Sequence, residues 1–295
     1  MTSTSEQHSA NLFGMGRLIT RRRFFAGVGA TLAGTLLYAN RIEPHRVTIV
    51  SRELPIANLP KDLNGKILVQ ISDLHIGPTG DDYLRSCFRL VEGLNPLLIV
   101  ITGDFVTGRG SEEIAHVGSL ISELKTPPLG IVGTFGNHDY GPTWAQAPIA
   151  DKLAETLRDC GLKVLRNQLI DVSGMQIVGM DEVWAGKFLP QAAFEDYDSE
   201  RAGIALSHNP DTLDRPGWGD YRGWVLCGHT HGGQCKLPFF RPPFLPVENP
   251  RYTSGEIDVG EGRRIYINRG LGYARRVRFN ARPEITAFTL RLAEN

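Results

Sequence analysis

Seven residues of this sequence form a candidate set of transition-metal ligands. Three offer carboxylate or amide oxygens, four offer imidazole nitrogens and none offers a thiolate: Asp73, Asp104, Asn137, His75, His208, His229 and His231. Oxygen and nitrogen ligands without sulfur suit Mn²⁺, Fe or Zn²⁺. Seven ligands exceed the needs of one ion, so we expect two ions that share a carboxylate. A pair of ions ~3.5–4 Å apart can hold the attacking and the leaving oxygen of a displacement at phosphorus.

Each of these side chains stands just behind a short apolar run with strand character. Residues 65–72 precede Asp73 and His75, and the nearly all-apolar residues 97–102 precede Asp104. The other ligands follow three similar runs, at residues 130–135, 203–207 and 223–227. Polar residues placed repeatedly behind strands predict one site at the carboxyl edge of a sheet.

Segments with helical periodicity lie between these strands. Apolar residues recur every three or four positions over residues 81–94, 111–124 and 150–160, which predicts three amphipathic helices. Strands that alternate with helices indicate an α/β fold.

The second half of the sequence predicts antiparallel pieces. Residues 168–172 and 175–180 flank a Ser-Gly turn, residues 256–259 and 263–268 flank a Gly-Glu-Gly turn, and residues 283–291 alternate as a last strand. No Gly/Ser linker or run of charge separates the two halves of the chain. We therefore expect a second sheet packed on the first rather than a second domain.

Four glycines stand beside the candidate ligands: Gly103, Gly136, Gly228 and Gly232. A residue without a side chain lets backbone approach an ion and adopts positive φ in a tight turn. Any one of them alone would be an ordinary turn glycine, but together with the ligands they are better explained by a metal site.

The candidate residues fall into five short blocks in a fixed order: D-x-H at 73–75, G-D at 103–104, G-N-H-D at 136–139, His208, and G-H-x-H at 228–231. Each block alone is common, but five in this order, each at a predicted strand end, are not expected by chance. The blocks resemble the signature of the calcineurin-like metallophosphoesterases. The resemblance covers residues 65–233 by motif and, more loosely, the tail to Asn295.

The resemblance implies a role for each residue of these blocks. Asp104 would bridge two ions, and hydroxide held by the metals would attack phosphorus. His138 would face the substrate phosphate and stabilise charge or protonate the leaving oxygen, with Asp139 orienting its ring. The remaining ligands would divide into two sets: Asp73, His75 and His231 on one ion, and Asn137, His208 and His229 on the other. The implied fold is a four-layer sandwich of two mixed β-sheets flanked by helices.

Composition excludes several other classes of protein. The chain has 295 residues, of which 41% are hydrophobic and 22% charged, so disorder is excluded as its main state. Thirty-two basic residues balance thirty-two acidic ones, and no aromatic-basic groove is evident, so we expect no nucleic-acid partner. Four cysteines without a CxxC pair indicate neither a disulfide scaffold nor a zinc ribbon.

The amino-terminal segment has the pattern of an export signal. The apolar run Phe24–Ala39 spans roughly 24 Å as a helix, short of the ~30 Å hydrocarbon core, so it is marginal as a membrane span. Arg21 and Arg22 followed by Phe24 resemble a twin-arginine signal. A signal anchor that uses its arginines only to set topology is the alternative.

These observations divide the chain in two. Residues 1–46 are predicted to be a twin-arginine-type signal or membrane anchor with its linker, and residues 47–295 the metallophosphoesterase domain. We expect export by the twin-arginine translocase to the periplasmic or extracytoplasmic face, with residues 20–39 as a possible membrane tether. Because that route carries folded proteins, the metals would bind in the cytoplasm before export. There the weaker-binding Mn²⁺ need not compete with Zn²⁺ or Cu²⁺ from outside, so we expect Mn²⁺.

Two further features bear on the substrate. Residues 237–246 are apolar, aromatic and rich in proline, and as an exposed loop they would meet a bilayer or an acyl chain. Capping of the sandwich core is the other interpretation, and both remain open. Arg275, Arg276 and Arg278 cluster near the carboxyl terminus, where their guanidinium groups would bind a second phosphate or form a solvated basic edge.

The signal, the GHTHGGQ segment and the terminal strand resemble a membrane-associated bacterial branch of the superfamily whose members are described as phosphodiesterases. The resemblance implies a two-metal phosphodiesterase or pyrophosphatase with a lipid-linked or cell-envelope substrate. Some relatives hydrolyse UDP-2,3-diacylglucosamine in lipid A synthesis, an alternative that fits poorly with export because that substrate is cytoplasmic. A non-catalytic metal-binding scaffold is the alternative from another class, although such scaffolds usually lose ligands that this sequence keeps.

Overall fold

The computed structural model describes residues 20–293, with gaps at 109, 111 and 238. The chain divides into two compact units, one ending at Leu37 and the other beginning at Tyr38. The first unit contains helix α1 (Arg21–Leu37), none of whose residues is buried. Residues 1–19 of the predicted signal lie outside the described residues. Within the described part of the chain, no helix combines the length and the apolar character needed to cross a membrane.

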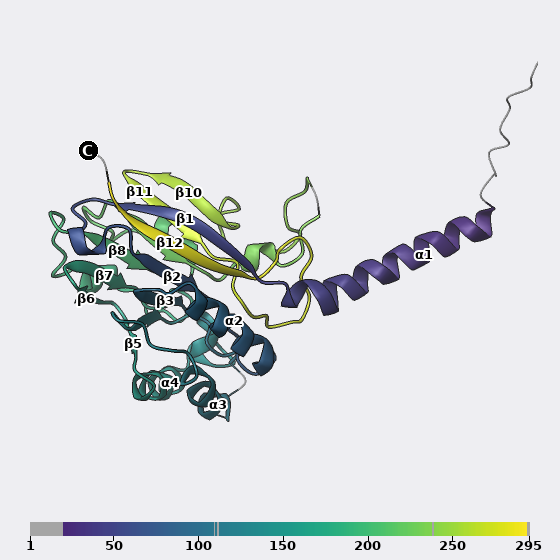
Figure 1. Ribbon diagram of the computed structural model, residues 1–295, viewed down its shortest axis with the longest axis horizontal. Coiled ribbons are helices and arrows are strands. Elements are labelled where there is room, and N and C mark those ends of the chain that lie inside the picture. Colours follow the sequence, from purple (N-terminus) through teal and green to yellow (C-terminus); the bar gives the residue numbers. More distant parts are fainter. Residues whose placement is uncertain (1–19, 109, 111, 238, 294–295) are drawn as a thin grey trace, which may run out of the picture. The chain divides into compact units, whose positions relative to one another are not determined.

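The second unit is built on two mixed six-stranded sheets, as the sequence predicts (Figure 1). The first sheet has, in spatial order, β1 (Thr48–Ile56), β12 (Glu284–Leu292), β2 (Ile67–Ile71), β3 (Leu98–Thr102), β4 (Ile131–Thr134) and β5 (Leu162–Val164). The second has β10 (Gly255–Gly260), β11 (Arg263–Ile267), β9 (Trp224–Cys227), β8 (Gly203–Leu206), β7 (Met175–Gly179) and β6 (Gln168–Val172).

Parallel pairing at the centre of each sheet gathers strand carboxyl ends at one edge. In the first sheet β2, β3, β4 and β5 pair in parallel. In the second, β11, β9, β8 and β7 pair in parallel. Both predicted hairpins are confirmed, since β6 pairs antiparallel with β7 and β10 antiparallel with β11.

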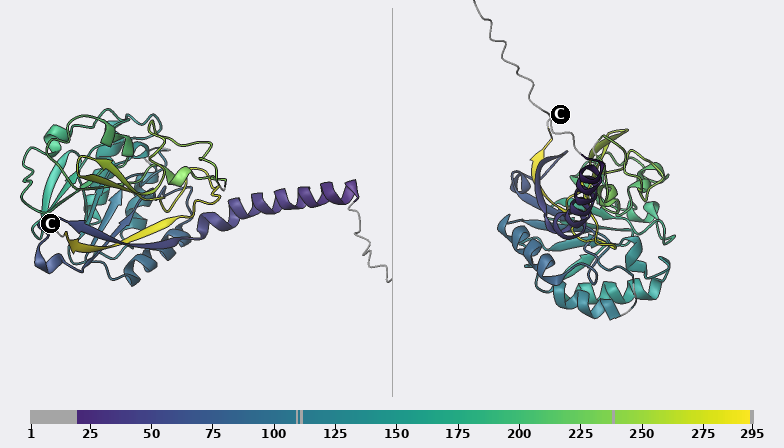
Figure 2. Two further views of the ribbon diagram at one scale, coloured as in Figure 1. Left: turned by 90° about the horizontal axis from the view of Figure 1, so that it is seen from above. Right: turned by 90° about the vertical axis from the view of Figure 1, so that its right-hand side faces the viewer.

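Three amphipathic helices lie on the outer face of the first sheet, and two further views show the same layering (Figures 1 and 2). They are α2 (Asp81–Gly93), α3 (Glu112–Ile121) and α4 (Ala147–Asp159). Each turns a stripe of apolar residues at helical spacing inward; in α2 the stripe is Leu84, Phe88 and Val91. Asp81 and Asp82 open α2, where carboxylates are favourable near the partial positive charge of a helix amino terminus.

Successive side chains of a strand point to opposite faces of its sheet and therefore belong to different hydrophobic layers. In β2, Val69 and Ile71 pack toward the helices, whereas Leu68 packs between the two sheets. The outer face of the second sheet is covered by loops, by the short helix α5 (Pro190–Ala193) and by aromatic residues such as Trp218. Buried Gln70 fastens the sheets together, because its Nε2 donates to the Cys227 carbonyl at 2.9 Å.

The second unit begins earlier than the predicted boundary between residues 46 and 47. The Ala39 carbonyl accepts the Arg278 N–H at 2.8 Å, and a carboxylate oxygen of buried Glu43 accepts the Ala281 N–H at 2.7 Å. These partners lie more than two hundred residues away, so no local pattern reveals them. The linker part of the predicted signal segment is therefore packed within the second unit.

Candidate metal centre

The seven candidate ligands leave the carboxyl ends of strands from both sheets. Asp73 and His75 follow β2, Asp104 follows β3, and Asn137 follows β4. The second sheet supplies the other three, His208 after β8 and His229 and His231 after β9. All seven side chains are buried. The parallel strands thus bring residues up to 158 positions apart in the sequence to one edge, as the sequence predicts.

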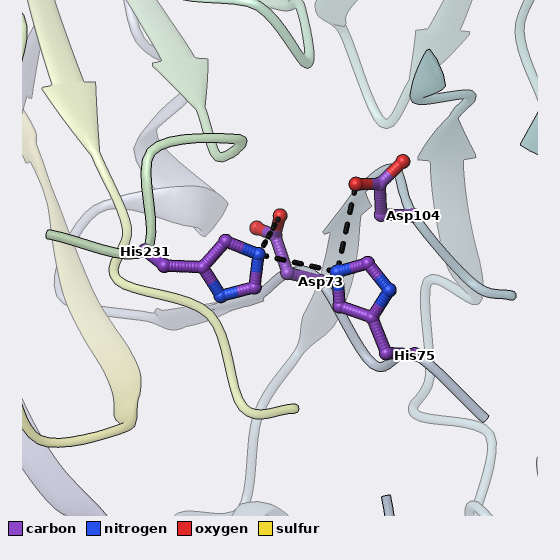
Figure 3. Close-up of side chains that lie close together, drawn as sticks. All are labelled: Asp73, His75, Asp104 and His231. Carbon is purple, nitrogen blue, oxygen red and sulfur yellow. Dashed lines mark hydrogen bonds and ion pairs between the residues drawn. The ribbon is translucent and has the colours of Figure 1, made fainter. Parts of the chain in front are cut away.

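Four of these side chains converge in one group (Figure 3). Ligand atoms of Asp73, His75, Asp104 and His231 all lie within 4.8 Å of one another. The His231 Nε2 atom lies 3.3 Å from an oxygen of Asp73 and 3.1 Å from the His75 Nε2 atom. Such close nitrogens and oxygens, facing inward from separate loops, form a donor set that fits a divalent cation.

A second group shares one carboxylate with the first. Ligand atoms of Asp104, His208 and His229 also lie within 4.8 Å of one another. The Oδ2 atom of Asp104 is 3.2 Å from the His208 Nε2 atom and 3.6 Å from the His75 Nε2 atom. One carboxylate oxygen therefore faces an imidazole of each group.

Asn137 adds an amide oxygen to the same region. Its side chain is buried, and its Oδ1 atom has no hydrogen-bond partner among the described residues. Because a buried polar atom without a partner is costly, this oxygen fits a position where it would face a cation. The structure therefore brings six of the seven proposed ligands into the two groups and places Asn137 in the lining of the same pocket.

Backbone carbonyls select the nitrogen that two of the histidines present. The His208 Nδ1–H donates to the Thr102 carbonyl at 2.7 Å, and Nε2 therefore faces the Asp104 carboxylate at 3.2 Å. The His229 Nε2–H donates to the Pro246 carbonyl at 2.7 Å, which leaves Nδ1 free and 3.1 Å from the His208 Nε2 atom. Second partners of this kind fix the tautomer and orientation of metal-binding imidazoles.

Burial and neighbouring charges shift the pKa values of several candidate ligands. Burial lowers the pKa of His75 and of His229 to about 3, so both imidazoles are neutral near pH 7. Burial alone would raise the pKa of Asp104, but nearby imidazoles, His208 foremost, hold it well below its usual range. Burial likewise disfavours charge on His208, yet the Asp104 carboxylate raises its pKa well above the usual range. A cation that takes the place of this proton would release it on binding.

Five of the ligands adopt the left-handed backbone conformation: Asp73 (φ 50°), His75 (φ 46°), Asp104 (φ 55°), His229 (φ 73°) and His231 (φ 50°). Asp and His tolerate this region better than most residues, but it still costs free energy and is concentrated at functional sites. Hydrogen bonds between the loops stabilise this backbone conformation. One of them runs from the Asp73 N–H to the Gly103 carbonyl at 2.9 Å.

Two glycines are required by the close approach of these loops. A Cβ atom at Gly103, whose φ is 84°, would lie 2.6 Å from both Gly136 N and His208 Nδ1. A Cβ atom at Gly136 would lie 2.7 Å from Asp104 N and from His208 Nε2. Any side chain there would push ligands apart, so these glycines belong to the site, as expected from the sequence.

The structure corrects the predicted role of Asp139. Its carboxylate does not face the His138 ring but accepts four backbone N–H groups, those of Gly136, Asp104, Phe105 and Val106. It therefore ties the loop after β3 to the loop after β4. The His138 ring is oriented instead by the Thr107 carbonyl, which accepts Nδ1–H at 2.8 Å and leaves Nε2 available.

The three predicted phosphate-binding arginines occupy different environments. Arg275 and Arg276 are exposed. Arg278 is fully buried, and its guanidinium donates to four backbone carbonyls and lies 3.2 Å from the His231 Nδ1 atom. The prediction for Arg278 is therefore corrected: it is neither a phosphate ligand nor part of a solvated edge, because the residue is fully buried and both of its terminal guanidinium nitrogens donate to backbone carbonyls.

The segment 237–246 does not cap the core. Phe239 and Phe240 are 105% and 68% exposed, and Leu237 and Phe244 are exposed as well. Residue 238 lies outside the described residues. Since Pro246 at the end of this segment binds His229, the loop is anchored to the candidate metal centre.

A pocket of about 170 Å³ opens over the ligands. His138, Asn137 and Asp104 line it, together with the aromatic side chains of Trp144 and Trp184. Sequence reasoning missed both tryptophans, because each stands alone in a loop without periodicity or a motif. Only the fold brings them to the ligands.

Comparison with known proteins agrees with this arrangement. Residues 67–233 match the family described as calcineurin-like phosphoesterase. The chain is 32% identical to the UDP-2,3-diacylglucosamine pyrophosphatase LpxG of Chlamydia trachomatis, over 85% of this chain and 91% of that protein. It is 32% identical to the phosphodiesterase YaeI of Escherichia coli, over 92% and 100%. It is also 32% identical to the uncharacterised metallophosphoesterase YkuE of Bacillus subtilis, over 92% and 98%.

Proposed function

From the premise that this chain belongs to the calcineurin-like phosphoesterase family, we propose that it hydrolyses phosphodiester or pyrophosphate bonds with two divalent ions. As a member of that family it is a metal-dependent phosphoric ester hydrolase. One observation carries the two-ion proposal. The Asp104 Oδ2 atom lies 3.6 Å from the His75 Nε2 atom and 3.2 Å from the His208 Nε2 atom, so a single carboxylate serves both ligand groups.

The proposed roles follow from the donor sets. One ion would be held by Asp73, His75 and His231, the other by Asn137, His208 and His229, with Asp104 between them. When bound, such ions lower the pKa of water and neutralise charge on phosphoryl oxygens. We propose Mn²⁺ as the physiological metal, because thiolates are absent from the set and three of its seven donors are the carboxylate or amide oxygens that suit this ion.

His138 is proposed to act as the general acid that protonates the leaving oxygen. Its Nδ1–H is held by the Thr107 carbonyl, so Nε2 is the nitrogen that exchanges a proton. Its backbone N–H donates to the Oδ1 atom of Asp104 at 3.0 Å, which fixes the ring beside the ligand groups. An acid at this place would protonate the departing alkoxide or phosphate.

A lipid-linked substrate is part of the proposal. The relative from Chlamydia trachomatis is named for a substrate that carries two acyl chains, and the loop 237–246 exposes apolar side chains next to the ligands. A pyrophosphatase acting on UDP-2,3-diacylglucosamine is therefore the second candidate function. A non-catalytic scaffold is disfavoured, because the chain keeps all seven ligands and His138.

A turnover screen tests the proposed function. The full chain, loaded with Mn²⁺, would be assayed against phosphomonoesters, phosphodiesters, nucleotide pyrophosphates and UDP-2,3-diacylglucosamine, each with and without a chelator. We expect chelator-sensitive hydrolysis of a diester or a pyrophosphate. Stoichiometric metal binding with no turnover of any class would instead support the scaffold.

Replacing both Phe239 and Phe240 with serine should reduce hydrolysis of a vesicle-embedded phospholipid substrate severalfold and leave a soluble diester unaffected. The two exposed rings would enter the bilayer, and serine cannot replace the apolar area they bury there. Vesicle sedimentation and turnover measure the effect. Leu189→Ser, which removes a side chain that is 57% exposed elsewhere, is the matched control. Equal loss on both substrates would contradict a membrane role.

Replacing Arg21 and Arg22 with lysine should retain the protein in the cytoplasm. We propose that residues 20–39 direct export by the twin-arginine translocase to the extracytoplasmic face. Lysine keeps the positive charge that orients a signal anchor, so only a system that reads the arginine pair responds. Cell fractionation measures the result, with Arg23→Lys as the control. Normal delivery of the double variant would show that the segment is an anchor.

A further inference from the structure

We propose that Trp144 and Trp184 form a binding wall for an apolar group esterified to the substrate phosphate. The inference rests on the proposed function, since it concerns the same site and narrows its substrate class. It assigns specificity to two residues outside the five sequence blocks.

The two indole rings lie between the metal ligands and the proposed proton donor. They stack on each other with centroids 5.2 Å apart and planes 28° from parallel. Trp184 lies edge-to-face with the His229 ring at 4.6 Å, and Trp144 lies edge-to-face with the His138 ring at 5.7 Å. A group bound against them would therefore be attached close to the reacting phosphorus.

Both tryptophans keep an exposed surface that the other two tryptophans of the chain lack. Trp144 and Trp184 are 39% and 37% exposed, whereas Trp218 and Trp224 are 2% and 5% exposed. The indole N–H groups of the latter two donate to backbone carbonyls inside the fold. Exposed aromatic surface at the wall of a pocket is typical of ligand contact rather than of core packing.

The rest of the pocket lining selects an apolar group rather than a second free phosphate. Phe244, Pro246 and Ala274 continue the wall beside the two tryptophans. Among the described residues that line the pocket, none is lysine or arginine. A further phosphate would find no cationic side chain there, while an aryl or alkyl group would leave water for an apolar surface.

The backbone supports this assignment. Trp144 has a φ of 56°, a conformation that is costly for a bulky residue and that is found mainly where function requires it. The bond from Trp144 N–H to the Gly141 carbonyl, at 3.0 Å, holds the turn. Trp184 is fixed in a similar way, because its N–H donates to the carboxylate of buried Glu182 at 3.0 Å.

Three diesters that share one leaving group test the proposal: methyl, phenyl and octyl p-nitrophenyl phosphate, with the full chain and Mn²⁺. The wild type should show a higher kcat/KM for the phenyl or the octyl ester than for the methyl ester. Preference for phenyl indicates a flat ring, and preference for octyl indicates an acyl chain. Trp144→Gly and Trp184→Ala should each reduce that preference about tenfold, while Leu90→Ala, at a helix position that is 39% exposed, leaves it unchanged.

Stability and binding measurements make the test decisive. Trp144→Gly should leave Tm unchanged or raise it, because glycine adopts positive φ without strain. An equal fall in kcat/KM for all three esters together with a lower Tm would overturn the proposal. If the wild type hydrolyses none of the esters, the phosphodiesterase part of the proposed function fails, and calorimetry with octyl-, phenyl- and methylphosphonate decides the inference alone. Tighter binding of an apolar phosphonate that is lost in the variants supports it, and equal binding refutes it.

Discussion

The Asp104→Ala variant is expected to lose both metal ions and to fall to the background rate of hydrolysis. Its Oδ2 atom faces an imidazole of each ligand group, and its Oδ1 atom accepts the backbone N–H of His138. No other described side chain takes part in both groups. Elemental analysis of the purified full chain measures the metal content, and turnover of the preferred diester measures the rate.

Asp181→Asn is the matched control for this variant. Asp181 is also a buried carboxylate beyond the end of a strand, but it is bonded to Arg166 and Tyr140 and belongs to neither ligand group. It should keep the metal content of the wild type. Two metals per chain in Asp104→Ala would refute the shared-carboxylate assignment.

The second large effect is expected for His138→Ala, which should lower kcat by roughly 10²–10⁴ while both metals stay bound. His138 lines the pocket and is not a member of either ligand group. Its removal takes away the acid for the leaving oxygen and leaves the donor sets intact. Comparison of kcat with metal content on the same preparation separates these two functions.

A histidine outside the centre provides the control. His116 bonds to Asp81 through Nε2 at 2.9 Å on the helical face of the first sheet, so His116→Ala should preserve kcat. Loss of metal along with activity in His138→Ala would assign this residue to the ligands instead. A leaving group of low pKa, such as p-nitrophenolate, should suffer less from the substitution than an alkoxide, because it departs without a proton.

The architecture could be predicted from the sequence because its determinants are local. Strands buried on both faces, such as β3, are continuous apolar runs, and a polar residue at the end of each run marks the carboxyl edge. The two hairpins can be predicted from the glycine-containing turns between their strands. The confirmed two-sheet fold, and the meeting of the six aspartate and histidine candidates at one edge, both follow from these signals.

What the sequence did not reveal depends on contacts between distant segments. Strand β1 was not anticipated, because it pairs with β12, whose residues lie more than two hundred positions away. Arg278 contacts the carbonyl of Ala39 and the ring of His231, which belong to distant segments, and Trp184 contacts Trp144 from a loop that follows a strand of the other sheet. Neither periodicity nor a motif in the sequence predicts contacts of this kind between distant segments.

The carbonyls of Thr102, Thr107 and Pro246 have a consequence for how this enzyme could diversify. They orient His208, His138 and His229 through main-chain oxygen, which every amino acid supplies. The orientation of these three imidazoles therefore does not depend on the side chains of the loop that leads to Pro246. Substitutions in that loop would leave the tautomers of the three histidines unchanged. Substitutions in this loop would then change which phosphoester substrate is bound, while the hydrolytic chemistry is inherited unchanged.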